Sequence, residues 1–280
     1  MRRAAVLAVL LALALLVWWP LWFILMGVFL PADELNLLLG PIFDAAAERY
    51  AAWTILPSWP TLQPLAELLL DTPEFFTVFW NSCALAFPQV LGQFLVGAPA
   101  AWAFARLRFP GRRALFALYV VLMLLPFQVT MVPNVLTLRR LGLLNTVWSI
   151  ILPTVFSPFY IFLLRQFMVG LPKELIEAAQ IDGSGTFRSF IHVVIPVCRP
   201  ILGAAAALSF ADCWNLVEQP LTYLTQRADL MPLSVMFNQL TENSSGVEFA
   251  GAALYILPAL FIYLYFQQDI LMGVQLTELK

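Results

Sequence analysis

Long runs without a charged side chain alternate with short polar stretches along the chain. A helix needs about 20 consecutive, mostly apolar residues to cross the hydrocarbon core of a bilayer, so each run is a candidate span. Five runs lack Asp, Glu, Lys and Arg: Ala4 to Ala32, Phe75 to Ala105, Ala114 to Leu138, Leu141 to Leu164 and Phe249 to Gln268. A sixth, Pro200 to Val217, is apolar apart from Asp212 and Asn215. The pattern predicts an all-α membrane protein with six transmembrane helices.

The first run begins after Arg2 and Arg3, as a secretory signal does. A signal core is only about 7 to 15 residues long, whereas this run continues through Trp18 and Trp22 without a small-residue cleavage pattern. We therefore expect it to be retained as the first span.

Composition supports a lipid environment and excludes several classes of protein. Of the 280 residues, 61% are hydrophobic and 11% charged, whereas an average soluble domain carries roughly 25% charged residues. The net charge of −2 leaves no basic footprint for nucleic acid. Cys83, Cys198 and Cys213 lack the spacing of metal ligands, so we expect no metal site and interpret them as small packing residues.

The distribution of basic residues predicts the orientation, because cytoplasmic loops are enriched in Lys and Arg. With both termini in the cytoplasm, 11 of the 15 basic residues fall on that side: Arg2, Arg3, Arg106, Arg108, Arg112, Arg113, Arg165, Lys173, Arg188, Arg199 and Lys280. With this orientation, most acidic residues fall on the extracytoplasmic side of the membrane. Several prolines lie within the runs, and the carbonyl groups that they free must be satisfied by neighbouring helices, which favours a packed bundle. The outer stretch from Asp33 to Glu74 includes an amphipathic cap.

The segment from Arg165 to Arg199 is the most structured polar stretch. Pro172 suits the first turn of a helix, Glu174 and Glu177 follow, and Gly183 is a natural stop, which predicts a helix of about three turns. We expect Leu175, Ile176 and Ala179 to form one face, Lys173 to pair with Glu177, and Thr186 to cap a second helix that runs to Pro196. An amphipathic hairpin lying on the inner leaflet is the alternative interpretation.

This segment resembles the "EAA" signature of permease subunits in binding-protein-dependent ABC importers. The matching residues are Glu177, Ala178, Ala179, Gly183, Val193, Ile195 and Pro196. The IDG sequence that ends at Gly183 is similar to the carbohydrate branch of this family, and the resemblance covers roughly residues 75 to 270. It implies the six-helix bundle of an ABC type I importer permease. Leu216, which stands where the family often has an acid, and the C-terminal tail depart from the pattern.

The resemblance also implies that this chain works with other subunits, each with its own role. The EAA helix of the family docks on a cytosolic ABC ATPase dimer, which assigns ATPase coupling to Glu177, Ala178, Ala179, Asp182, Gly183 and Pro196. A second permease subunit, an extracytoplasmic solute-binding protein, a sugar substrate and membrane lipid complete the expected partners at the bacterial inner membrane. We expect no cofactor and no catalysis by this chain, because GSGTFRS near Gly183 lacks the lysine of a phosphate-binding loop.

These inferences divide the chain into regions. We expect a first transmembrane helix at 1–32, an extracytoplasmic loop at 33–74, a five-helix permease core at 75–270 with its coupling loop at 165–199, and a cytoplasmic tail at 271–280.

The sequence allows two different roles for several polar or aromatic side chains. Asp212 either lines a translocation path or is a solvated carboxylate at a helix end. Trp214 either stacks on a sugar or, as we favour, belongs to an interfacial aromatic belt, and Asn215 shares this ambiguity. His192 is interpreted as a packing or interface residue. Arg139 and Arg140 lie on the outer side, against the charge rule, where they could contact a binding protein.

Two other classes of protein remain as alternatives to an importer subunit. A secondary transporter that works alone should carry several buried carboxylates or histidines, and the predicted spans contain only Asp212. A membrane enzyme or assembly factor should carry a cluster of polar residues, and the sequence shows none.

Overall fold

The computed structural model describes residues 2–43, 50–236 and 245–278, and these residues form helices and connecting loops without a strand. The helices before the coupling loop are α1 (Arg2–Gly27), α2 (Ala32–Phe43), α3 (Gln63–Ala66), η1 (Glu67–Asp71), α4 (Pro73–Gly92), η2 (Gln93–Gly97), α5 (Ala98–Arg106), α6 (Arg112–Met123), α7 (Phe127–Arg140), α8 (Trp148–Val155) and α9 (Pro158–Val169). Those that follow are α10 (Lys173–Ile181), α11 (Thr186–Ser189), η3 (Phe190–Val194), α12 (Ile195–Val197), α13 (Arg199–Trp214), α14 (Glu218–Tyr223), η4 (Ala228–Leu230), α15 (Leu233–Met236) and α16 (Ser245–Glu278).

The described helices contain four candidate membrane spans, and two bent helix pairs could supply two more. Four stretches are long and apolar enough to cross a membrane: Ala5–Gly27, Pro73–Arg106, Trp148–Val169 and Gly246–Met272. Two further runs are helix pairs bent by 108° (α6 with α7) and by 77° (Thr186–Val197 with α13). Counting each bent pair as one span gives six spans, and the orientation of the chain in the membrane stays a prediction.

The chain divides into two compact units, Met1–Phe79 with Met236–Pro258 (unit 1) and Trp80–Val235 with Ala259–Lys280 (unit 2). In unit 1, the rings of Phe23, Trp53 and Phe249 pack together, with centroids 3.8 to 5.9 Å apart. Leu35 and Leu39 are buried on one face of α2 while Leu37 is 76% exposed, so the described part of the predicted cap is amphipathic. The rest of the predicted cap, residues 44–49, lies outside the described residues.

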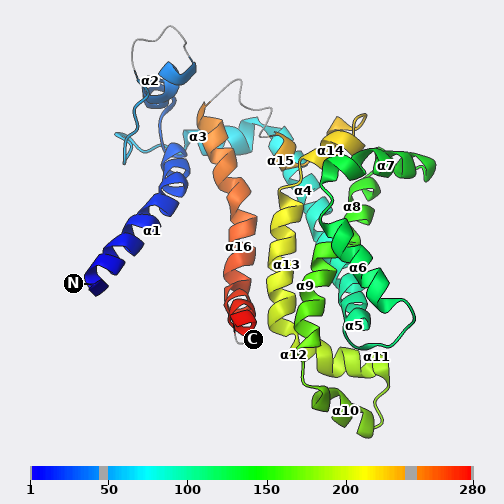
Figure 1. Ribbon diagram of the computed structural model, residues 1–280. Helices are drawn as coiled ribbons and strands as arrows, with labels where there is room; N and C mark the ends of the chain where they lie inside the picture. The colour runs from blue at the N-terminus through cyan, green and yellow to red at the C-terminus, as the bar shows by residue number, and fades with distance from the viewer. Residues whose placement is uncertain (1, 44–49, 237–244, 279–280) are drawn as a thin grey trace. The chain divides into compact units, whose positions relative to one another are not determined.

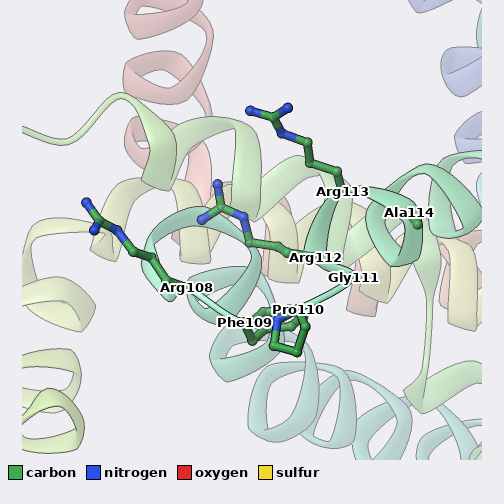
Figure 2. A pocket seen from close by; sticks show the side chains of 7 residues that line it. All are labelled: Arg108, Phe109, Pro110, Gly111, Arg112, Arg113 and Ala114. Atoms are coloured by element: carbon green, nitrogen blue, oxygen red, sulfur yellow. The ribbon is translucent and has the colours of Figure 1, made fainter.

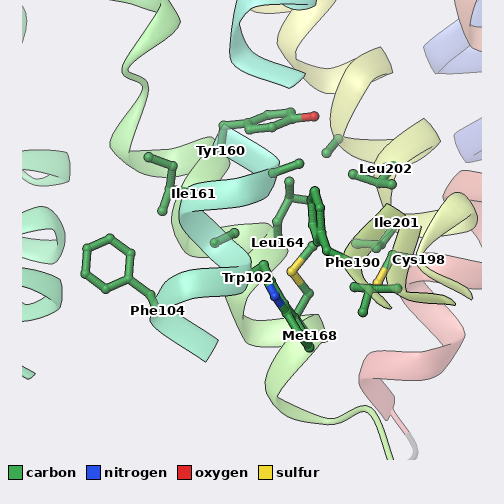
Figure 3. Close-up of a cluster of buried hydrophobic side chains, with 14 residues drawn as sticks. Trp102, Phe104, Tyr160, Ile161, Leu164, Met168, Phe190, Cys198, Ile201 and Leu202 are labelled. Carbon is green, nitrogen blue, oxygen red and sulfur yellow. The ribbon is translucent and has the colours of Figure 1, made fainter. Parts of the chain in front are cut away.

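The main core of unit 2 lies between α5, α9, η3 and α13 (Figure 3). Trp102, Tyr160, Leu164, Met168 and Phe190 belong to this core, and all are less than 7% exposed. Cys198 lies in this core and Cys213 is also buried, as the sequence interpretation expects, whereas Cys83 is half-buried.

Close helix packing at η2 depends on two glycines. A Cβ atom on Gly92 would lie 2.4 Å from Cγ2 of Val155, and one on Gly97 would lie 2.6 Å from Cδ1 of Tyr160. Both distances are too short for real carbon atoms, so any larger residue would push α8 or α9 away.

Although the N–H of Ser157 donates to the carbonyl of Thr154 at 3.1 Å, the break between α8 and α9 follows from Pro158. This residue cannot donate to the carbonyl of Thr154, four residues earlier. Nε2 of Gln93, from η2, donates to that carbonyl oxygen at 3.1 Å. A buried polar side chain thus supports the break between α8 and α9.

The C-terminal stretch does not form a separate tail. The last helix, α16, continues to Glu278, so the region 271–280 that the sequence assigns to a cytoplasmic tail begins inside a helix. The uncharged run ends at Gln268, but no glycine or proline follows at once to end the helix. The first charged residue therefore marks the end of the candidate span, whereas the helix itself continues.

Candidate functional site

The candidate site is the coupling loop, residues 165–199, and its first arm is the helix α10. Within unit 2, α10 and α11 lie at one end and α7 and α14 at the other (Figure 1). Pro172 takes the N-cap position and the helix begins at Lys173, one residue later than the sequence predicts. Glu174 lies in the first turn, where a negative charge favours the helix dipole.

Gly183 ends α10 through a Schellman motif. The N–H of Gly183 donates to the carbonyl of Gln180 at 3.0 Å, and the N–H of Ser184 donates to that of Ala179 at 2.9 Å. Gly183 has φ of +80°, a conformation that residues with a Cβ rarely adopt. The prediction that this glycine stops the helix and turns the chain is therefore confirmed.

The EAA residues of α10 are spread around the helix: Ala178 is exposed, Ala179 is half-buried, and the exposed Glu177 borders a hollow between α10, α5 and α11. No residue of α10 is fully buried; Ile176 and Ala179 are half-buried, and Ile176 packs against the main core. Glu177, Ala178, Asp182 and Gly183 are exposed. Of the three residues of the predicted apolar face, Leu175 is the most exposed, at 42%.

Large apolar side chains are exposed around this face. Ile181 is 86% exposed and Phe187 is 71% exposed, although both lie in a compact polar loop. Together with Leu175 and Ala178 they form an apolar surface, which we call the coupling face. An exposed apolar patch is typical of a surface that contacts another protein or a membrane. Glu177 contributes a charge beside the coupling face, and Lys173 does not pair with it among the described residues, contrary to the prediction.

The second arm of the loop returns to the core through α11, η3 and α12. The N-cap of α11 is Gly185, so the prediction that Thr186 caps it is wrong: Thr186 is the first helical residue, and it makes no capping bond. Phe190 and Val194 are buried, and Pro196 is exposed in the first turn of α12.

Arg106, at the end of α5, forms hydrogen bonds to the backbone near the start of the coupling loop. Its guanidinium donates to the carbonyl oxygens of Met168 at 3.2 Å, of Val169 at 3.4 Å, and of Leu171. These are carbonyls at the C-terminal end of α9, which a cation stabilises. Sequence reasoning missed this role because it treats Arg106 only as a topology signal; the proximity arises from the packing of α5 on α9.

A cavity of about 440 Å³ lies between α5, α10 and α11. Among its lining residues are Trp102, Arg106, Ile176, Gln180 and Ser189. The lining residues of α10 also include Lys173 and Glu177.

The residues proposed for a translocation path lie at the end of α13. Asp212 and Asn215 are exposed, and Nδ2 of Asn215 donates to the carbonyl of Ala211 at 2.8 Å. Trp214 is 2% exposed and stacks on Phe210, with centroids 5.5 Å apart. The prediction that Trp214 belongs to an interfacial belt is wrong, because a ring buried inside the protein cannot reach a lipid interface.

The other polar residues fall in separate places. Nδ1 of His192 lies 3.1 Å from the carbonyl oxygen of Arg188, one turn earlier, on the exposed side of η3. Arg139 and Arg140 are exposed at the end of α7. Within the described residues, no group of three or more His, Cys, Asp or Glu side chains could hold a metal ion.

Comparisons with curated proteins place the chain among permeases. The arabinooligosaccharides transport system permease protein AraQ of Halalkalibacterium halodurans is 29% identical over 251 residues, which cover 88% of this chain and 90% of that protein. The lactose transport system permease protein LacG of Rhizobium radiobacter is 31% identical over 70% of this chain and 72% of its own length. The diacetylchitobiose uptake system permease protein NgcG of Streptomyces coelicolor is 33% identical over 69% and 66%.

A solved structure shares the fold. A chain of a bacterial ABC transporter involved in the import of the acidic polysaccharide alginate superposes with a TM-score of 0.79 over 95% of both chains, at 22% identity. The family described as binding-protein-dependent transport system inner membrane component matches residues 93–270, which include the whole coupling loop. The chain is therefore a multi-pass membrane protein that belongs to the family of inner membrane components of binding-protein-dependent transport systems.

Proposed function

We propose that this chain is the permease subunit of an ATP-driven importer for a sugar or oligosaccharide, and that it is not itself catalytic. The named activities of its relatives, which include transport of arabinooligosaccharides and lactose, support a carbohydrate substrate. Other relatives are named as permeases for sn-glycerol-3-phosphate and for osmoprotective compounds, so another small solute is the alternative substrate. An ABC ATPase dimer, a second permease and an extracytoplasmic solute-binding protein are the partners of this proposal.

The coupling face is the observation that carries the proposal. Leu175, Ile181 and Phe187 expose apolar surface that a cytosolic ATPase would cover, and Ala178 lets its backbone approach α10 closely. The Schellman motif at Gly183 and the hydrogen bonds of Arg106 to the end of α9 fix the chain on either side of α10. Force applied to α10 would therefore be transmitted to α9 and α13 through backbone and core contacts.

Asp212 and Asn215 are the proposed path residues of this chain. Both are exposed polar groups at the end of a candidate span, where a hydrated path needs hydrogen-bonding partners. Trp214 contributes by holding this helix end through its stack on Phe210.

Co-purification tests the proposal directly. The full chain, tagged and expressed with the products of its neighbouring genes, should be purified together with an ATPase and a second permease. The Ala178→Trp variant should lose the ATPase, because an indole on the coupling face prevents close approach. The matched control is Ala228→Trp, the same change at an exposed alanine at the other end of unit 2, which should keep the ATPase.

Two results would overturn the proposal. One is a wild-type chain that transports its solute after purification without any ATPase. The other is unchanged ATPase binding and solute uptake in Ala178→Trp.

A further inference from the structure

The segment 50–62, which precedes α3, lies beside the C-terminal part of α1 within unit 1 (Figure 1). Nε1 of Trp22 donates to the carbonyl oxygen of Ile55 at 3.1 Å. The N–H of Thr61 donates to the carbonyl of Phe29, beyond the end of α1, at 3.0 Å. The chain bends at Ile55 and Leu56, so these two residues, which we call the loop tip, reach back along α1 before the chain returns.

The loop tip lies level with the edge of the hydrocarbon core. The candidate span begins at Ala5, and about 30 Å of hydrocarbon takes about 20 residues at about 1.5 Å each, which ends near Ile24. Trp22 therefore lies at the boundary where tryptophan is enriched in membrane proteins. Phe29 lies beyond this boundary, so the segment crosses the membrane interface between the loop tip and Thr61.

The chemistry of the loop tip suits an apolar environment. The side chains of Ile55 and Leu56 are 64% and 65% exposed. Their backbone carbonyls are nonetheless paired with protein donors, the indole of Trp22 for Ile55 and the hydroxyl of Thr54, at 2.6 Å, for Leu56. Pro57 follows and has no N–H to satisfy. Because lipid supplies no donor to a carbonyl group, a tip in lipid requires this pairing, whereas a loop in water does not.

Polarity rises immediately after the loop tip. The carboxylate of Glu34 accepts hydrogen bonds from the N–H and the hydroxyl of Ser58 at 3.0 to 3.2 Å. Trp59, the next residue, is 80% exposed, and an exposed indole suits the headgroup region. The segment 50–62 contains no charged residue, whereas the turn 108–114 carries three arginines (Figure 2). Of these two surface segments, only 50–62 can enter lipid without desolvating a charge.

We propose that the loop tip inserts Ile55 and Leu56 among the acyl chains of the leaflet that surrounds the C-terminal end of α1. Continuity with α1 supports lipid as the occupant, because Leu21 and Leu25, on either side of Trp22 in the sequence, are also exposed. A protein that covered the tip would have to reach the level of the hydrocarbon core. The insertion anchors the loop at the membrane surface, and it depends on α1 spanning the membrane but not on which solute is transported.

Nitroxide labels at Leu56→Cys and Leu62→Cys test the proposal by comparing two leucines of one loop that are 65% and 60% exposed. The full chain, with the subunits that accompany it, is placed in lipid nanodiscs after Cys83, Cys198 and Cys213 have been replaced by alanine. Electron paramagnetic resonance measures collisions with oxygen, which concentrates in hydrocarbon, and with a water-soluble nickel complex. The label at 56 should collide more with oxygen, and the label at 62 more with the nickel complex.

The hydrogen bond from Trp22 can be tested separately. Trp22→Phe removes the N–H that holds the loop tip but keeps an apolar ring. Loss of one hydrogen bond should raise the fraction of loop tips outside the lipid roughly 2- to 12-fold, so nickel collisions at label 56 should increase. Trp18→Phe makes the same change one turn earlier on α1 and should leave both collision rates unchanged.

The wild-type chain provides a second measurement that needs no cysteine replacement. Phosphatidylcholine with a diazirine on the upper part of one acyl chain is photolysed in the nanodisc, and the labelled residues are located by mass spectrometry. Label should appear at Ile55 or Leu56, whereas Leu62 and the arginine turn 108–114 should stay unlabelled.

Three results would overturn the proposal. The first is a label at 56 that collides mainly with the nickel complex, as the label at 62 does. The second is an equal effect of the two tryptophan variants. The third is protection of label 56 from both reagents, without photolabelling of the loop tip, because a protein subunit would then cover it.

Discussion

Replacing Gly183 by alanine tests whether the turn after α10 depends on its backbone conformation. A Cβ at this position would meet no atom within 4 Å, so the substitution has no steric cost from neighbours. The cost comes only from φ of +80°, which is unfavourable by roughly 1 to 2 kcal/mol for an L-residue. We expect the Schellman motif to open about 5 to 30 times more often in Gly183→Ala.

Hydrogen exchange measures this opening without any partner subunit. The amides of Gly183 and Ser184 donate to the carbonyls of Gln180 and Ala179, so their exchange should accelerate by the same factor. Gly183→Asn should have a smaller effect, since asparagine adopts the left-handed conformation more readily than alanine.

Gly185 is a matched control two residues away. It also has no atom within 4 Å of a built Cβ, but its φ of −69° suits any residue. Alanine there should leave exchange of the turn unchanged or slow it slightly, because alanine restricts the unfolded chain. Equal acceleration in both variants, or no acceleration in Gly183→Ala, would refute the assignment of the turn to backbone strain.

Three further predictions concern packing, the loop anchor and pH. Gly92→Ala should destabilise the protein by about 1 to 3 kcal/mol through its clash with Val155, and thermal unfolding in detergent should show recovery in the double variant with Val155→Ala. Arg106→Gln should accelerate hydrogen exchange at the start of the coupling loop, and Arg106→Lys should also accelerate it, though less, because it keeps the charge but loses the planar fork; wild-type exchange in Arg106→Lys would contradict the role of the fork. The Arg227 guanidinium lowers the pKa of the exposed Asp229 carboxyl, so their pair persists above that pKa and is lost as pH falls through it; Arg227→Gln should raise the pKa of Asp229 in an NMR titration, and an unchanged value would contradict the pairing.

Local patterns in the sequence predict the features that depend on neighbouring residues. Gly183 follows a short helical pattern and precedes another glycine, which is sufficient to predict the helix end. Gaps between charges locate the candidate spans because the bilayer sets their length.

The features that sequence reasoning missed depend on tertiary packing. Hydropathy gives Trp214 the same value in an interfacial belt as in a core, and only its stack on Phe210 distinguishes the two. Arg106 becomes an anchor only because α5 packs against α9. Leu175 is apolar at helical spacing, but an exposed apolar residue on a docking surface has the same pattern as a buried one.

The close approach of α13 and α16 has a consequence for biosynthesis. A Cβ on Gly203 would lie 2.5 Å from Oδ2 of Asp269 and 2.7 Å from the ring of Phe266, so α16 covers α13 at this glycine. A ribosome synthesises residues 266–269 well after Gly203. Until then, the backbone around Gly203 stays open to lipid or chaperones. Insertion of the last helix therefore closes unit 2, and a chain stopped before residue 259 should be recognised by membrane proteases as incomplete.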